Sequence, residues 1–350
     1  MDPAVLGPIL RTGVIPGGVA LAALVLVWRP WRGGRVRARH PVPIATALGF
    51  LVGCVSIVGW QGSADVGGAV GGVIDGSVGP WDAIRGVWSG LWRGLWPVDP
   101  VHRMGQYGLL GLAGALMVSR LPESEALRWL LVRLVIQMGV VSGAVLMLLW
   151  PLVSDRWGPG MSVGAVLGLG VAGTIWWSVI GGAAVRRPGA LVGSTLAAVS
   201  VVSAATLVPA GHGLLALQTV MLGVVLLVCA VAALVRPKLT ETRAVGAVPA
   251  VAFAVLWGGG VFYAPERIPA VSLVLLGVSP LAVWVSRAPR VREWRAWRSG
   301  LAQVVVAVVL AWSAGAIASV APGRGDKEPG SLDTGGWDSA GEGAGSGGDG

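Results

Sequence analysis

Apolar residues gather in ten continuous runs along the chain, and glycine, proline and charged residues separate one run from the next. A helix that crosses the hydrocarbon core of a bilayer needs roughly 20 such residues, and most of the runs are about that long. The runs show no apolar–polar alternation, which favours membrane helices over the strands of a membrane barrel. The expected helices cover residues 9–28, 41–60, 104–119, 129–153, 161–185, 190–210, 214–235, 244–263, 270–286 and 301–321. The pattern therefore predicts an all-α, polytopic membrane helix bundle over residues 1–321.

Two of these runs match a membrane-spanning helix less well than the others. The first contains Pro16, and the third is short and holds Gly105, Gly108, Gly111 and Gly114. Glycine and proline both lower the stability of a helix interior. The sequence leaves open whether these two helices cross the bilayer completely.

The composition supports a membrane protein and excludes other classes. Apolar residues make up 54% of the chain and charged residues 12%, about half of the roughly 25% that is usual in water-soluble domains. Soluble, fibrous and disulfide-stapled proteins are excluded on this ground. The two cysteines, Cys54 and Cys229, each lie within an apolar run, where we expect free thiols and not a disulfide.

The distribution of basic residues predicts the orientation, because cytoplasmic connections retain Lys and Arg. The odd-numbered connections, together with Arg133, hold 18 of the 26 Lys and Arg residues, and eight lie on the other side. Both termini are therefore expected outside. The same division attributes the net charge of +9 to topology and not to a nucleic-acid partner. Arginine far outnumbers lysine and asparagine is absent, which is typical of GC-rich bacterial genes and predicts the bacterial cytoplasmic (inner) membrane.

Two segments lie outside the expected helices. The long external connection 61–103 contains an amphipathic helix at 81–96, whose apolar face carries Trp81, Trp88, Trp92 and Trp96. Tryptophan favours the membrane–water interface, so we expect this helix to anchor on the external surface, with a platform for a lipid or glycan as the alternative. The tail 322–350 is rich in glycine, serine and acidic residues, and we expect it to be disordered.

The cytoplasmic loop before the last run is a second expected contact with lipid. It concentrates arginine and tryptophan, a composition that binds anionic headgroups. The anchoring residues are Arg290, Arg292, Trp294, Arg295, Trp297 and Arg298. The predicted partner is thus the lipid bilayer, with anionic lipids at the cytoplasmic loops.

Polar residues inside the expected helices are few. None of the 17 Asp and Glu residues lies near the middle of a run, although ion-coupled transporters usually place ionisable groups there. A polar path for a substrate would have to use Arg133, Gln137, Ser200, Ser203, Thr206 and Gln218. Two simpler alternatives stay open: Arg133 can extend to the cytoplasmic interface, and the hydroxyl groups can bond to their own helix backbone.

Asp99, His102 and Arg103 are the candidate catalytic residues. They place a carboxylate, an imidazole and a guanidinium within about a turn of one another, before the third run, and such groups can perform acid–base chemistry. A polar junction at the start of a membrane helix has the same composition. Three scattered histidines without clustered cysteines or carboxylates predict no metal site, and no motif predicts a cofactor.

The lack of buried carboxylates and of a catalytic motif favours a non-enzymatic, multi-pass membrane protein. It would transport a neutral or lipid-like solute or act as an envelope scaffold. The alternative is an envelope enzyme that acts on a lipid-linked substrate at the external face, with Asp99, His102, Arg103, Arg85 and Arg93 as its candidate residues.

Overall fold

A computed structural model describes residues 10–28, 41–61, 100–122, 126–186, 189–235, 243–263, 268–287, 291 and 296–320. These residues form helices joined by short turns, and no strand occurs among them, which confirms the all-α fold class. The surface helix at 81–96 with its four tryptophans and the tail 322–350 lie outside the described residues. Most of the basic anchoring loop also lies outside them.

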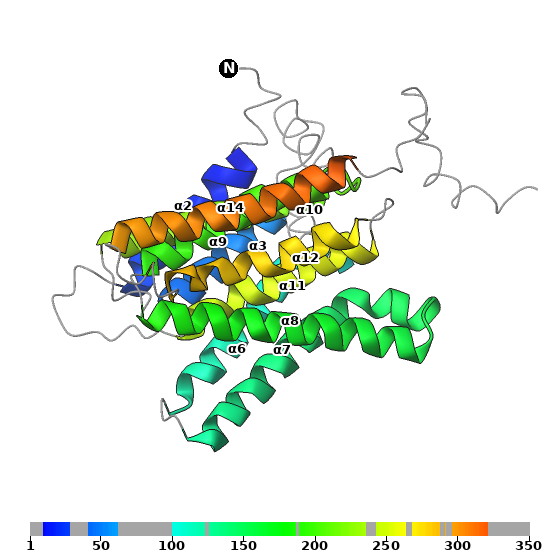
Figure 1. Ribbon diagram of the computed structural model, residues 1–350, viewed down its shortest axis with the longest axis horizontal. Coiled ribbons are helices and arrows are strands. Elements are labelled where there is room, and N and C mark those ends of the chain that lie inside the picture. Colours follow the sequence, from blue (N-terminus) through cyan, green and yellow to red (C-terminus); the bar gives the residue numbers. More distant parts are fainter. Residues whose placement is uncertain are drawn as a thin grey trace, which may run out of the picture. The chain divides into compact units, whose positions relative to one another are not determined.

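A helical segment occupies each of the ten apolar runs (Figure 1). The elements in chain order are η1 (Leu10–Val14), α2 (Ile15–Trp28), α3 (Pro41–Gln61), η2 (Pro100–Arg103), α6 (Met104–Arg120), α7 (Leu127–Asp155), α8 (Pro159–Arg186), α9 (Gly189–Leu207), α10 (Gly213–Val235), η4 (Arg243–Gly246), α11 (Ala247–Phe262), α12 (Ala270–Val278), η5 (Ser279–Arg287) and α14 (Ala296–Val320). Within the described part, six helices are long and apolar enough to cross a membrane: α7, α8, α9, α10, η4 with α11, and α14. These helices indicate a membrane protein.

The centre of the bundle is α11, which is buried on every side from Ala247 to Gly260. It contacts α3, α6, α7, α8 and α10, and in Figure 1 α11 and α12 lie between the α7–α8 hairpin and the group of α9, α10 and α14. A helix that is apolar all round is stable only when every face is covered. Pro249 is tolerated because it lies in the first turn of α11, where the backbone N–H has no partner within the helix.

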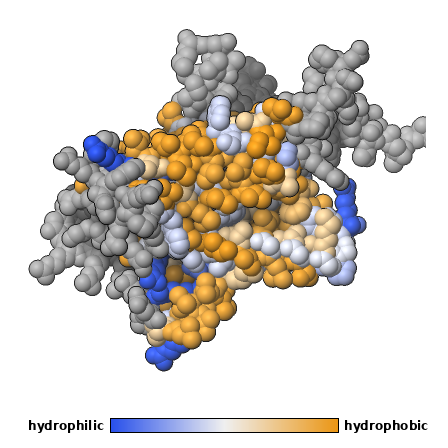
Figure 2. All heavy atoms as spheres, in the orientation of Figure 1, coloured by the Kyte–Doolittle hydropathy of each residue, from blue (hydrophilic) through white to orange (hydrophobic). Residues whose placement is uncertain are grey.

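The outer helices are apolar on the surface that faces away from α11. Val135 and Trp150 of α7 are 71% and 59% exposed, and Trp312 of α14 is 65% exposed. Figure 2 shows that hydrophobic residues dominate the described surface in this view, with hydrophilic residues near its edges. Exposed apolar area of this extent is unusual for a soluble monomer and is what contact with lipid requires.

Pro280 and Gly211 make the α-helices in two of the predicted runs shorter than the runs themselves. Pro280 cannot donate a backbone hydrogen bond, so the ninth run forms α12 only to Val278 and continues as the 3-10 helix η5. In the sixth run α9 ends at Leu207, where His212 N donates to Leu207 O at 3.1 Å. Gly211 supplies the positive φ of 83° that this helix-ending motif requires.

The turn between α9 and α10 gives a pH-dependent prediction. Burial lowers the pKa of His212 below 6.5, and a hydrogen bond to the backbone of Tyr263 offsets part of this effect. The unfolded chain therefore takes up a proton at a higher pH than the folded one, so stability is present above about pH 6.5 and declines as the pH falls. We expect the unfolding temperature in detergent to drop between pH 7.5 and 5, and to drop less in His212→Gln. Equal slopes in both proteins would assign the pH dependence to other groups.

Candidate functional site

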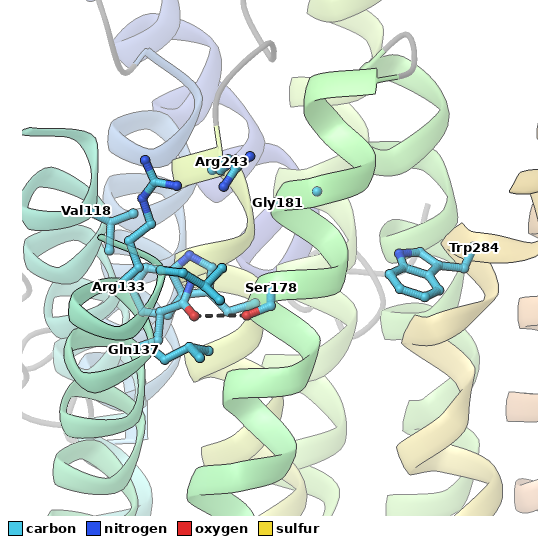
Figure 3. Close-up of a pocket in the computed structure, with 11 residues that line it drawn as sticks. Val118, Arg133, Gln137, Ser178, Gly181, Arg243 and Trp284 are labelled. Atoms are coloured by element: carbon cyan, nitrogen blue, oxygen red, sulfur yellow. Dashed lines mark hydrogen bonds between the residues drawn. The ribbon is translucent and has the colours of Figure 1, made fainter. Parts of the chain in front are cut away.

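A cavity of about 240 Å³ lies where α6 and α8 end and where α7 and η4 begin. Its polar lining consists of Arg133 and Gln137 from α7, Ser178 from α8 and Arg243 from η4. We call this space the arginine cavity. The sequence analysis had singled out Arg133 and Gln137, and the structure brings them together with two further polar residues (Figure 3).

The four-residue spacing on α7 places Arg133 and Gln137 on the same face of the helix. Both side chains are only 6% exposed. A guanidinium nitrogen of Arg133 donates to the backbone carbonyl of Pro122, just beyond the end of α6. One turn further along α7, Gln137 Oε1 accepts a hydrogen bond from Ser178 Oγ at 2.9 Å. The polar groups thus reach about 15 Å along α7, from its first residue to Gln137.

Arg243 completes the polar side of the cavity. It is the first residue of η4 and is partly exposed, and Figure 3 shows its guanidinium at the same end of the cavity as that of Arg133. Its backbone lies against α8 at Gly181, where an added Cβ would be 2.5 Å from Arg243 O. Because glycine has no side chain at this contact, η4 can approach α8 closely and hold Arg243 beside the cavity.

Part of the lining of the arginine cavity is apolar and exposed. Leu130, Leu134 and Trp284 form this part and are 46%, 37% and 44% exposed. The indole nitrogen of Trp284 donates to Val179 O at 3.4 Å, which holds η5 against α8. The cavity therefore combines two guanidinium groups with an apolar rim.

The described charged residues of the site, Arg133 and Arg243, are both basic. Among the described residues that line the cavity none is acidic. Asp155, the one acidic residue in the described ranges, is the last residue of α7, at the end remote from Arg133. Arginine presents parallel N–H donors to carboxylate or phosphate oxygens, so the arrangement can bind an anion.

The other candidates for a polar path lie elsewhere. Ser200 donates to Leu196 O at 2.9 Å and Ser203 donates to Ser200 O at 3.0 Å, so both hydroxyls bond to their own helix. Thr206 and Gln218 are fully buried, and their polar side-chain atoms have no hydrogen-bond partner within the described part of the chain. None of these four residues lines the arginine cavity.

The candidate catalytic residues are only partly described. His102 and Arg103 are half-buried in η2, directly before α6, and Asp99 lies outside the described residues. The described ranges contain no group of three or more His, Cys, Asp or Glu residues that could hold a metal ion. Cys54 and Cys229 are free and buried.

The anchoring candidates at the start of α14 are also only partly described. Trp297 and Arg298 belong to this helix, and Arg298 is exposed, whereas the side chain of Trp297 is not described. Arg290, Arg292, Trp294 and Arg295 lie outside the described residues.

Sequence reasoning missed Arg243, Ser178 and Trp284 as parts of one site. Arg243 counted only as a basic residue of a connection, and Ser178 was one hydroxyl within an apolar run. A signal for Arg243 was present, because it stands directly before an apolar run, as Arg133 stands near the start of another. The pairing of Ser178 with Gln137 depends on how α7 and α8 are rotated, which the residues alone do not determine.

Comparison of this chain with protein-family models, curated proteins and solved structures found no match.

Proposed function

We propose that this chain is a multi-pass protein of the bacterial inner membrane that transports a lipid-like solute, and that the arginine cavity binds the anionic group of that solute. In this proposal the chain crosses the membrane ten times with both termini outside. It acts on its solute without chemical conversion. The cavity then opens at the cytoplasmic end of the bundle, where the sequence places 18 of the 26 Lys and Arg residues.

One observation carries the proposal: two arginines and an exposed apolar rim line the same cavity. A soluble anion needs the guanidinium groups and no apolar rim, whereas an amphiphile needs both. Ser178 and Gln137 extend the polar lining one turn toward the middle of the membrane, where a solute would have to pass. The largely buried position of Arg133 supports a ligand role, because placing a charge in the membrane is costly and is usually retained for function.

The test uses a single cysteine in place of Ser178, which is exposed and lines the cavity. The two native cysteines are first replaced by alanine. A transporter that opens to each side in turn should expose this cysteine to a membrane-impermeant thiol reagent both in inverted vesicles and in intact cells. We expect labelling from both sides, with labelling from the cytoplasmic side faster.

Two control variants report the orientation in the same experiment. Gly34→Cys should react only in inverted vesicles and Gly345→Cys only in intact cells. Labelling of Ser178→Cys from the cytoplasmic side alone would mean a fixed binding site and would overturn transport. Labelling of Gly34→Cys in intact cells would overturn the proposed orientation.

A further inference from the structure

We infer that η5 is a movable gate of the arginine cavity and that Gln303 of α14 holds it in the observed position. The gate opens when η5 rewinds from a 3-10 helix to an α-helix, because this turns Trp284 out of the cavity lining. The inference rests on the proposed function in one respect, namely that the solute enters the arginine cavity. It requires no particular ligand and no particular charge in the cavity.

The winding of η5 is unusual for the length of this segment. η5 runs over nine residues, whereas 3-10 helices rarely exceed three or four residues because their hydrogen bonds have poorer geometry. A 3-10 stretch in line with an α-helix, as η5 follows α12, often marks a hinge or a strained segment. The same residues also begin with a signal for an α-helix, since serine is a preferred N-cap and proline is common at the first helical position. Ser279 and Pro280 match that signal, so the segment has both windings available.

Rewinding changes the position of Trp284. A 3-10 helix turns about 120° and rises about 2.0 Å per residue, and an α-helix turns about 100° and rises about 1.5 Å. Over the five residues from Ser279 to Trp284 the difference is about 100° of rotation and about 2.5 Å of length. This rotation carries the indole away from Val179 O, to which its nitrogen donates at 3.4 Å, and out of the cavity lining. Residues 281–285 are all apolar, so either winding presents apolar side chains to the surrounding helices and the membrane.

The end of α12 is fixed to the bundle core and provides a pivot for η5. Trp176 of α8 is 4% exposed, and its Nε1 donates to Gly277 O of α12 at 2.8 Å. The Trp176 ring lies edge-on to Trp257 of α11, with 5.1 Å between the ring centroids. Trp257 in turn stacks on Phe253, with 4.9 Å between the centroids. These contacts hold α12 in place while η5 turns beyond Pro280.

Beyond the pivot, side-chain hydrogen bonds hold η5 from both sides. On the α14 side, Gln303 is 1% exposed and its Nε2 donates to Val283 O at 2.7 Å. On the α8 side, the bond from Trp284 to Val179 O is long for an N–H donor. Rewinding turns Val283 by about 80°, so its carbonyl leaves Gln303 and the stronger of these bonds is made only in the 3-10 form. Gln303 is thus a positioning residue for Trp284.

The experiment follows hydrogen–deuterium exchange by mass spectrometry in the purified full-length protein in detergent. We expect the peptide that covers 279–287 to exchange faster than α11, which is enclosed on every side. Gln303→Met should speed this exchange by about two- to tenfold, the change in population that the loss of one hydrogen bond produces. The matched control is Tyr263→Phe, which removes a bond of 2.7 Å from Tyr263 Oη to Leu148 O at the far end of α11. It should leave the exchange of 279–287 unchanged.

A second measurement links the gate to the cavity. Ser178 precedes Val179, and Figure 3 shows the Trp284 indole directed at α8, the helix that carries both residues. Cysteine at position 178, in the protein without native cysteines, is reacted with the impermeant thiol reagent in inverted vesicles. Gln303→Met should speed this reaction at least twofold, and Pro280→Ala should do the same because a backbone N–H there lets α12 continue as an α-helix. Once Pro280→Ala is present, Gln303→Met should add less than about twofold, since the bond acts on the 3-10 form only.

Three outcomes would overturn the inference. Exchange of 279–287 as slow as that of α11 in the parent protein would exclude a movable gate. Equal exchange and equal thiol reaction in Gln303→Met and the parent protein would exclude Gln303 as the residue that holds it. Full effects of Gln303→Met in the presence of Pro280→Ala would exclude rewinding. Exchange that depends on Gln303, combined with labelling of Ser178→Cys from the cytoplasmic side alone, would support the gate and exclude transport.

Discussion

Replacing Gly181 with alanine is expected to lower the unfolding temperature of the protein and to weaken anion binding in the arginine cavity together. The added Cβ would lie 2.5 Å from Arg243 O and 3.2 Å from Arg243 Cα. Both are backbone atoms, so η4 must move away from α8 because no flexible side chain can yield. Overpacking of this kind typically costs about 1–3 kcal/mol.

The effect on binding has the same cause. Gly246 at the other end of η4 is also in close contact with α8, since a Cβ there would lie 2.8 Å from Trp177 O. η4 is thus held against α8 at two glycines, Gly181 of α8 and Gly246 of η4. Gly181 lies beside the backbone of Arg243. Moving η4 off α8 displaces Arg243 from its position in the lining of the cavity. Binding of an anionic lipid in the arginine cavity should therefore weaken in Gly181→Ala.

The matched control is Gly168→Ala on the same helix. No atom lies within 4 Å of a Cβ added at Gly168, and this residue is exposed. Alanine is the better helix former by up to about 1 kcal/mol, so the control should be as stable as the parent protein or slightly more stable. Thermal unfolding in detergent and binding of an anionic lipid to the purified protein are measured on both variants. Equal stability and equal binding would show that η4 is not positioned by its contact with Gly181.

The apolar runs were sufficient to predict the all-α class and a membrane protein, because a run of about 20 apolar residues has few other stable environments. The position of a proline changed where one of the helices ends. Pro280 ends α12 and turns the rest of that run into η5. The central position of α11 was not predicted, although its sequence is apolar on every face, because the α10 run is nearly as apolar and the residues do not say which helix is enclosed.

The candidate site was predicted in part for a physical reason. A charged residue inside an apolar run is conspicuous, and this identified Arg133 with Gln137 on the same helix face. The remaining members depend on contacts between distant segments. Ser178 lies 41 residues from Gln137 in the chain, and Arg243 reaches the cavity through a glycine contact that spacing cannot reveal. The serines of α9 were candidates for a path by their spacing, and both donate to carbonyls of their own helix, which is the alternative that the sequence left open.

Replacing Gln218 with methionine is expected to make the protein more stable. Gln218 is fully buried on α10, and neither its amide nitrogen nor its amide oxygen has a hydrogen-bond partner within the described residues. Its neighbours along the helix pack into apolar surroundings, because Leu215 lies against Gly259 of α11 and Met221 lies against Gly53 of α3. A buried polar group without a partner costs about 1–3 kcal/mol, and methionine has a similar shape without that cost.

The control is Gln303→Met in α14. Gln303 is almost equally buried and its Oε1 also has no partner among the described residues, but its Nε2 donates to Val283 O at 2.7 Å, so the substitution removes an existing hydrogen bond along with one unpartnered atom. We expect Gln303→Met to change the stability by less than about 1.5 kcal/mol and Gln218→Met to raise it by about 1–3 kcal/mol, measured by thermal unfolding in the same detergent. A loss of stability in both variants would show that Gln218 has a partner outside the described residues.

The functional meaning of Gln218 follows from combining this result with the cysteine experiment. A residue that lowers stability and contributes nothing is easily replaced during evolution, whereas one that serves function is retained at that cost. If Gln218→Met is more stable and Ser178→Cys in this background is still labelled from both sides, Gln218 is dispensable for opening to either side. If the more stable protein is labelled from the cytoplasmic side only, the unpartnered amide is needed for the outward-open state. Gln218 would then belong to the polar path.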